Sequence, residues 1–198
     1  MSGARLIFVR HAETHNETRG RVVGRTDVAL STDGVAHAER IAVRLATDPI
    51  AAVYSSPLRR ALATAAPLAR TLGLEVTTAD DLREIDFGEL EGLTVGEATE
   101  RYPVEANWMT APAGARFPGG ESVASLRERA VGAAHHIAAG HQGETVAVFS
   151  HAVVIRAIVA DALSMPPDAM FRLDQSYCGV TILEWFDAQP FVRMVNAA

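Results

Sequence analysis

The sequence predicts an α/β protein in which helices cover both faces of a mainly parallel central sheet, a three-layer α/β/α architecture. Two observations predict it. Short apolar segments alternate with longer segments of helical period, and three of the short ones are dense in Val, Ile, Leu and Phe, as strands covered on both faces are. At 198 residues the chain is long enough for one sizeable core, so we expect a single domain over residues 1–198.

The expected strands are short β-rich segments bounded by turn residues or charges. The last of them lies near the C-terminus and is a candidate sheet edge for pairing across a homodimer. These strands cover residues 5–10, 52–55, 74–78, 145–150 and 180–185.

Four helices are expected between and after these strands. Ser31 and Ser122 can each cap a first helical turn, and Ser56 precedes Pro57, which suits the first helical position. Gly73 is a typical helix stop, and Pro166 prevents continuation of the last helix. The expected helices cover residues 32–46, 57–72, a segment from 123 onward, and 153–163.

Residues 90–120 have a different character. They contain three proline-bearing segments, and only residues 94–102 show a weak helical period. Such an insertion over a sheet can form a lid above a binding site. Its candidate substrate contacts are Tyr102, Trp108, Met109, Arg116 and Phe117.

The charge balance excludes some classes of partner. Eighteen basic against 24 acidic residues give a net charge of −6, so we expect neither nucleic acid nor a membrane surface as a partner, and an anion site would need a local group of arginines. The single cysteine, Cys178, cannot form an internal disulfide or a thiolate metal site. No stretch approaches a membrane span or a secretory signal, so we expect a cytoplasmic protein.

Polar side chains follow the predicted strands at the end where α/β sheets usually bind ligands. Arg10 and His11 end the first strand, His151 follows the fourth, and Arg60 lies at the start of the helix after the second. In a parallel sheet these ends meet at one edge. Glu84 is the plausible carboxylate for the same cleft.

This set of residues suits a phosphate ester. Guanidinium groups match phosphate oxygens, and an unprotonated imidazole can attack phosphorus and carry the phosphoryl group. Glu84, kept partly protonated by a secluded setting, could donate a proton to the leaving oxygen. A metal site is the chemical rival, but His135 and His136 are adjacent and no His-Glu-x-x-His spacing occurs, so we expect no metal and no cofactor.

Five blocks of the sequence resemble the histidine phosphatase superfamily, also called phosphoglycerate mutase-like. The first is similar to its Arg-His-Gly-Glu-Thr signature. The blocks are RHAET (10–14) continued by GRTDVALS (24–31), SSPLRRA (55–61), EIDFGELEG (84–92), FPGGES (117–122) and SHAVVIR (150–156).

The resemblance implies the superfamily's fold and assigns roles to these residues. It implies that His11 is the phosphorylated nucleophile, that Arg10, Arg60 and His151 form the phosphate pocket, and that Glu84 is the general acid and base. It also implies substrate-side positions at Gly24, Ala152 and Asn16.

The sequence departs from the family's pattern at several of these positions. Asn16 stands one position before the family's usual asparagine, where this chain has Glu17, and Val23 replaces a common glutamine. Ala12 and Ala152 replace glycines. These departures concern substrate contacts rather than the chemistry.

Three functions follow as alternatives: a phosphomonoesterase, a cofactor-dependent phosphoglycerate mutase, and a non-catalytic phosphate-binding protein. The segment from Glu84 to His151 is shorter than in similar true mutases, and the Glu-Ile-Asp-Phe-Gly block is similar to phosphatase relatives. Retention of all the polar groups argues against a scaffold. The sequence therefore predicts a phosphatase for a small phosphate ester, and leaves open which ester.

Overall fold

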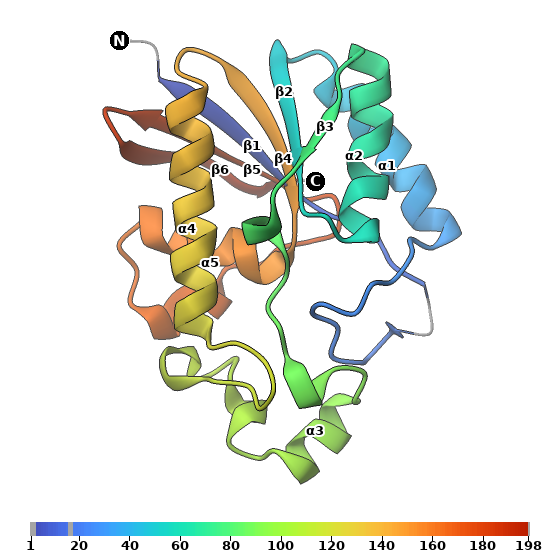
Figure 1. Ribbon diagram of the computed structural model, residues 1–198, viewed down its shortest axis with the longest axis vertical. Coiled ribbons are helices and arrows are strands. Elements are labelled where there is room, and N and C mark those ends of the chain that lie inside the picture. Colours follow the sequence, from blue (N-terminus) through green and yellow to red (C-terminus); the bar gives the residue numbers. More distant parts are fainter. Residues whose placement is uncertain (1–2, 16–17, 198) are drawn as a thin grey trace.

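The computed structural model describes residues 3–15 and 18–197. Its centre is a six-stranded sheet with the strand order β3-β2-β4-β1-β5-β6 (Figure 1). Helices pack on both of its faces, through one apolar cluster on each side. The predicted three-layer α/β/α class is therefore confirmed.

The strands divide into a parallel group and an antiparallel pair. Four strands run parallel to one another: β1 (Ala4–Arg10), β2 (Ile50–Ser55), β3 (Val76–Thr78) and β4 (Thr145–Ser150). The other two, β5 (Val180–Phe186) and β6 (Gln189–Ala197), are antiparallel to their neighbours. The carboxyl ends of β1, β2 and β4 consequently meet at one edge of the sheet.

The expectation that residues 180–185 form a sheet edge is wrong. β5 lies between β1 and β6, and the edge on that side is β6. β6 was not predicted from the sequence; its apolar residues are interrupted by Arg193 and are at most partly buried.

The central strand β1 is buried on both faces. Leu6 and Phe8 pack in the cluster that includes residues of α4 (Val123–Gly140) and α5 (Ala152–Ala162). Ile7 and Val9 face the opposite cluster, with residues of α1 (Thr32–Leu45) and α2 (Arg59–Leu72). Because β1 is enclosed on both faces, the polar residues at its carboxyl end have a fixed position.

The helices follow the predicted caps with one exception. The hydroxyls of Ser31 and Ser122 accept hydrogen bonds from backbone N–H groups three residues on, and Gly73 ends α2 in the left-handed conformation. The predicted start of that helix at Pro57 is wrong, since α2 begins at Arg59. Ser56 instead accepts from the N–H of Leu58 at 3.3 Å and closes a turn before the helix.

Residues 90–120 fold into α3 (Val95–Arg101) and two short 3-10 turns (Glu105–Asn107 and Pro112–Gly114), placed below the sheet in Figure 1. The segment is anchored by aromatic packing. The Trp108 ring lies 5.0 Å from that of Phe87 and 4.7 Å from that of Phe171, measured between centroids.

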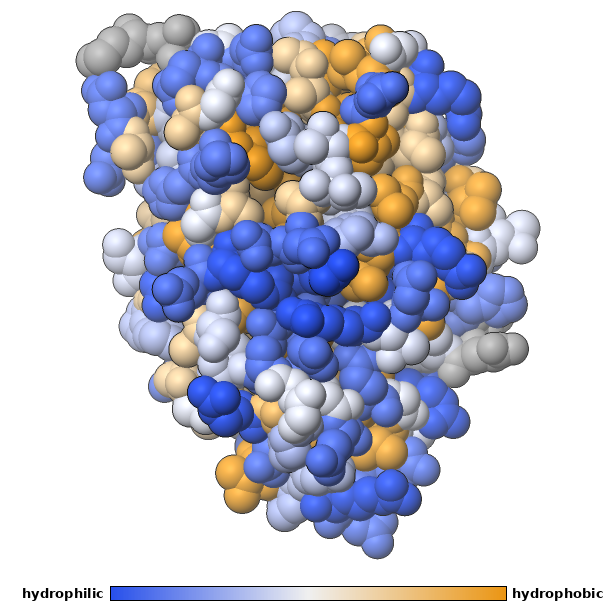
Figure 2. Space-filling view, viewed as in Figure 1, coloured by the Kyte–Doolittle hydropathy of each residue, from blue (hydrophilic) through white to orange (hydrophobic). Residues whose placement is uncertain are grey.

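The surface is mixed in character. Figure 2 shows hydrophilic residues across the middle of one face with apolar groups scattered around them. The exposed large apolar side chains, which include Val43, Val104 and Phe191, are spread over several parts of the fold. None of the helices in the described ranges is both long enough and apolar enough to cross a membrane.

Ser31→Ala should lower the free energy of unfolding by about 1 kcal/mol, because the N–H of Gly34 loses the hydroxyl acceptor that lies 2.9 Å away. Chemical denaturation measures the change. Ser31→Asp keeps an acceptor and should retain most of the stability. An equal loss in both variants would contradict the capping role.

Candidate active site

Two histidines meet at the carboxyl ends of β1 and β4. The strands pair in register up to Arg10 and Ser150, and the N–H of His11 then donates to the carbonyl of Ser150 at 2.9 Å. The rings of His11 and His151 consequently lie 5.2 Å apart, measured between centroids. The two strand ends thus bring the two histidines together, as expected, while their shared role in a site stays a prediction.

The His11 ring is held in one tautomer. Its Nδ1 lies 2.8 Å from the carbonyl oxygen of Ala12, which can only accept, so Nδ1 carries the proton and Nε2 keeps its lone pair. Burial, together with Arg60 and Arg10, lowers the pKa of His11 well below its ordinary value. The imidazole is therefore neutral, with an unprotonated Nε2, over a wide pH range.

Arg60 comes from the first turn of α2 and is 1% exposed. Its Nη1 donates to the carbonyl of Thr26 at 2.9 Å, and its Nη2 donates to that of Gly24 at 2.6 Å. The carbonyl of Gly24 thus helps to hold the Arg60 guanidinium in place. A Cβ at Gly24 would clash with the carbonyl oxygen of Ile85, so the position has no room for a side chain. The neighbouring Arg59 is exposed.

Arg10 lies between a backbone carbonyl and an aromatic ring. Its Nη1 donates to the carbonyl of Gln175 at 2.5 Å, and its guanidinium carbon is 4.0 Å from the ring centroid of Tyr177. The same tyrosine ring lies 5.7 Å from that of His11. Tyr177 was not predicted, because an isolated tyrosine before β5 carries no local signal of a site.

His151 is fully buried, and Ser56 orients its ring. Nε2 lies 2.8 Å from Oγ of Ser56, and because the described residues offer this hydroxyl no other acceptor, we assign it as the donor to Nε2. That leaves the ring proton on Nδ1, a buried atom that has no partner within the described residues. Burial and Arg60 lower the pKa of His151 well below its ordinary value. His151 therefore presents an unused N–H donor.

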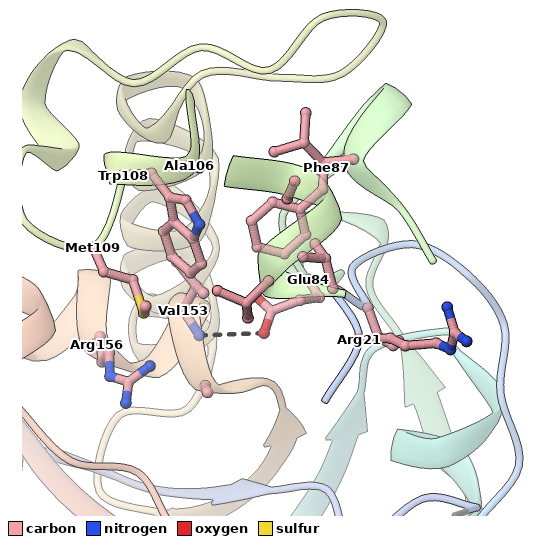
Figure 3. Close-up of a pocket in the computed structure, with 14 residues that line it drawn as sticks. Arg21, Glu84, Phe87, Ala106, Trp108, Met109, Val153 and Arg156 are labelled. Carbon is pink, nitrogen blue, oxygen red and sulfur yellow. Dashed lines mark hydrogen bonds between the residues drawn. The ribbon is translucent and has the colours of Figure 1, made fainter. Parts of the chain in front are cut away.

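Glu84 is 6% exposed and faces the same place. One carboxylate oxygen accepts from the N–H of Ile85 at 3.0 Å and the other from that of Val153 at 3.3 Å (Figure 3). Burial raises the pKa of Glu84 in spite of Arg60 nearby. Arg129, which was not predicted, fixes this segment by donating to the carbonyl of Glu84 at 3.2 Å.

A cavity of about 140 Å³ is lined by four of these groups, Arg10, His11, Arg60 and Glu84, whereas the fully buried His151 does not line it. Three arginines against one glutamate give it a cationic wall suited to an anion. Five of its residues were not predicted as contacts. The lining consists of Arg10, His11, Thr14, Thr18, Arg21, Val23, Arg60, Glu84 and Tyr177. Asn16 lies outside the described residues, so its contact with substrate stays a prediction.

A second cavity of about 240 Å³ adjoins the first and shares Arg21, Val23 and Glu84 with it. Ala152 lines this second cavity rather than the first. Two of the contacts predicted in residues 90–120, Trp108 and Met109, line it as well.

The other three contacts predicted in that segment lie elsewhere. Phe117 is buried in the core, Tyr102 donates a hydrogen bond to Glu89, and Arg116 lines a separate surface cavity. In the described part of the chain, no group of three or more His, Cys, Asp or Glu side chains is placed to hold a metal ion.

Fold and site together define an α/β protein with a cationic pocket for an anion at the carboxyl ends of parallel strands. The model of the histidine phosphatase superfamily (branch 1) matches residues 6–198. The chain therefore belongs to this superfamily.

Individual relatives agree with this assignment. A bifunctional protein of Mycobacterium tuberculosis is 37% identical over 97% of this chain and 53% of its own length. Phosphoserine phosphatase 1 of Hydrogenobacter thermophilus is 38% identical over 81% of this chain and 77% of its own. The solved structure of a mycobacterial glucosyl-3-phosphoglycerate phosphatase superposes with a TM-score of 0.90 at 26% identity, covering 99% of this chain and 100% of that one. The chain spans about half the length of the mycobacterial relatives found by sequence.

Glu84→Gln should raise the melting temperature at pH 8 relative to the wild type and have no such effect near pH 4. Because burial raises the folded-state pKa, the protonated carboxyl favours folding below the ordinary pKa, and this stability is lost as pH rises through the folded value. The loss amounts to about 1.4 kcal/mol for each unit between the two pKa values.

The exposed Glu100→Gln serves as the control and should change neither melting temperature. A lower melting temperature for Glu84→Gln at pH 8 would show that the arginines outweigh the burial of Glu84.

Proposed function

We propose that this protein is a metal-independent phosphomonoesterase that hydrolyses small phosphate esters through a phosphohistidine at His11. One observation carries the proposal: an imidazole with a free Nε2 lone pair lines the same cationic pocket as Arg10, Arg60 and a buried acid. The phosphatase names of relatives from Hydrogenobacter and Mycobacterium support it.

Binding of the ester would use the fixed positive charges. Arg10 and Arg60 stay charged at all relevant pH values, and their forked donors match phosphate oxygens. The Nδ1–H of His151, which has no partner in the described part of the chain, adds a donor for a phosphoryl oxygen. Two guanidinium groups can supply the charge stabilisation that a metal ion supplies in other phosphatases.

The reaction would proceed in two displacements. In the first, the lone pair of His11 Nε2 forms a bond to phosphorus, the phosphorus–oxygen ester bond breaks, and Glu84 gives its proton to the departing oxygen. In the second, the Glu84 carboxylate takes a proton from water as the water oxygen bonds to phosphorus. The phosphorus–nitrogen bond then breaks and its electron pair returns to Nε2, which releases inorganic phosphate.

Residues 90–120 would act as a lid, since they supply Trp108 and Met109 to the cavity beside the pocket. One domain over residues 1–198, a cytoplasmic location, a possible homodimer and the absence of a nucleic-acid partner stay predictions from the sequence.

His11→Asn should reduce hydrolysis of p-nitrophenyl phosphate by more than about a thousandfold, because the attacking lone pair is gone. Release of phosphate measured with a chelator present tests the reaction and its independence of metal together. Rapid acid-free quenching of the wild type should trap acid-labile phosphate on His11. The exposed His136→Asn is the matched control and should keep full activity. Wild-type protein that is inactive, or active only with a divalent ion, would refute the mechanism.

The mutase alternative differs in the second displacement, in which a phosphoglycerate instead of water accepts the phosphoryl group. With 2-phosphoglycerate and a bisphosphoglycerate primer, the proposed phosphatase should release phosphate faster than it forms 3-phosphoglycerate. Faster isomerisation would assign the mutase function.

Glu84→Gln should slow benzyl phosphate about 10²–10⁴-fold and p-nitrophenyl phosphate much less, because only the poor alkoxide leaving group needs the proton. For the wild type, kcat/KM with benzyl phosphate should fall in acid through the lowered pKa of His11, and in base through the raised pKa of Glu84. For Glu84→Gln, the decrease of kcat/KM in base should disappear. If hydrolysis of both esters were slowed equally, Glu84 would not be the general acid.

A further inference from the structure

The cavity beside the phosphate pocket is where the alcohol part of an ester would lie. The two cavities share Glu84, Arg21 and Val23, so Glu84 stands at the boundary where an ester oxygen would join phosphate to its leaving group. What lines the second cavity therefore bears on which leaving group the site accepts.

The walls of this cavity are mostly apolar. Trp108 and Phe87, packed 5.0 Å apart between ring centroids, form one side, and Met109 and Val153 extend it (Figure 3). Val23 places an apolar side chain at the boundary with the phosphate pocket. About 150 Å³ suffices for a benzene ring in an apolar cavity, so the 240 Å³ here accommodates one ring with a substituent.

Two cations line this cavity: Arg21 at the boundary with the phosphate pocket, and Arg156 within the apolar wall. Arg156 follows Ala152 by four residues and Val153 by three, so the three residues share one face of α5. All three line the cavity. In Figure 3, Arg156 and Arg21 lie on opposite sides of Glu84.

The charge of Arg156 has no close counter-ion. Its Nε donates to the carbonyl of Leu173 at 2.7 Å, and this is the one hydrogen bond that its guanidinium makes within the described residues. No carboxylate oxygen of that part of the chain lies within 4.0 Å of it, whereas Arg127 pairs with Asp161 at 2.8 Å. Two forked donors thus remain for a ligand in a half-buried, largely apolar setting.

We propose that the site prefers phosphate monoesters of a compact, one-ring apolar alcohol that carries a carboxylate, with the ring between Trp108 and Val153 and the carboxylate on Arg156. This specificity rests on the proposed phosphatase function and names its substrate class. Arg156 acts here as a specificity-determining residue, separate from the phosphate-binding arginines.

A matched series of esters tests the proposal, because benzyl esters keep the leaving group nearly constant. The probes are benzyl phosphate, its 3- and 4-carboxy derivatives, the corresponding carbamoyl derivatives, and glycerol 3-phosphate as a polar primary ester. For the wild type, kcat/KM should favour benzyl over glycerol phosphate. One carboxy isomer should exceed its carbamoyl counterpart about tenfold to a hundredfold, the range of a hydrogen bond to a charged group.

Substitutions of Arg156 test whether this residue causes the preference for the carboxy ester. Arg156→Met should bring the carboxy-to-carbamoyl ratio close to one, and Arg156→Lys should keep part of it. Arg101→Met, an exposed arginine of α3 that lines neither cavity, should leave the ratio unchanged. Because each ratio is taken within one protein, partial loss of folded enzyme does not alter it.

The possible failures are distinct. Absence of hydrolysis with every ester, p-nitrophenyl phosphate included, would overturn the phosphatase function. Hydrolysis of p-nitrophenyl phosphate with a ratio near one in the wild type, or a ratio that Arg156→Met does not change, would overturn the inference alone. A preference for glycerol 3-phosphate over benzyl phosphate would overturn the apolar part of it.

Discussion

The parallel pairing of β1 with β4 is the constraint on which the site depends. It ends with the N–H of His11 on the carbonyl of Ser150, which places the two histidine rings 5.2 Å apart. Because β1 is buried on both faces, a slip of one residue would exchange the side chains that face the two apolar clusters, so the register is strongly specified. The apolar packing of the sheet therefore fixes the spacing of two polar groups at its edge, and no contact between the histidines themselves is needed to hold them.

The electrostatics of the pocket follow from how its cations are held. Arg10 and Arg60 donate to backbone carbonyls, and in the described residues neither has a carboxylate within 4.0 Å. Their charge is stabilised by dipoles without being neutralised, so it remains available to a phosphate dianion. Burial, together with the same charges, lowers the pKa of both histidines, and burial raises the pKa of Glu84. One buried environment thus favours an unprotonated imidazole and a protonated carboxyl together, which is the pair of states that the proposed first displacement needs.

The sequence predicted those features that have local signals. Apolar runs marked β1 and β4, serines marked the starts of α1 and α4, and strand-end positions marked the two histidines. The sequence did not predict the features that depend on tertiary contacts. β6 is only partly buried, so its strand character comes from pairing with β5 rather than from its own pattern. Tyr177 reaches the site because β5 lies beside β1, and Gly24 proved to support Arg60 through its carbonyl, a role that residue type alone does not indicate.

The position of Glu84 at the boundary of two cavities has a consequence for how the site can vary. The phosphate side is built by the end of β1, the start of α2, Glu84, Tyr177 and loop residues 14–23, whereas the other side is built mainly by residues 87–109 and α5. Substitutions at Trp108, Met109 or Arg156 alter the second side without touching the groups that would hold phosphorus. The alcohol that the site accepts can therefore change through the second side alone, while the bond-breaking groups stay the same.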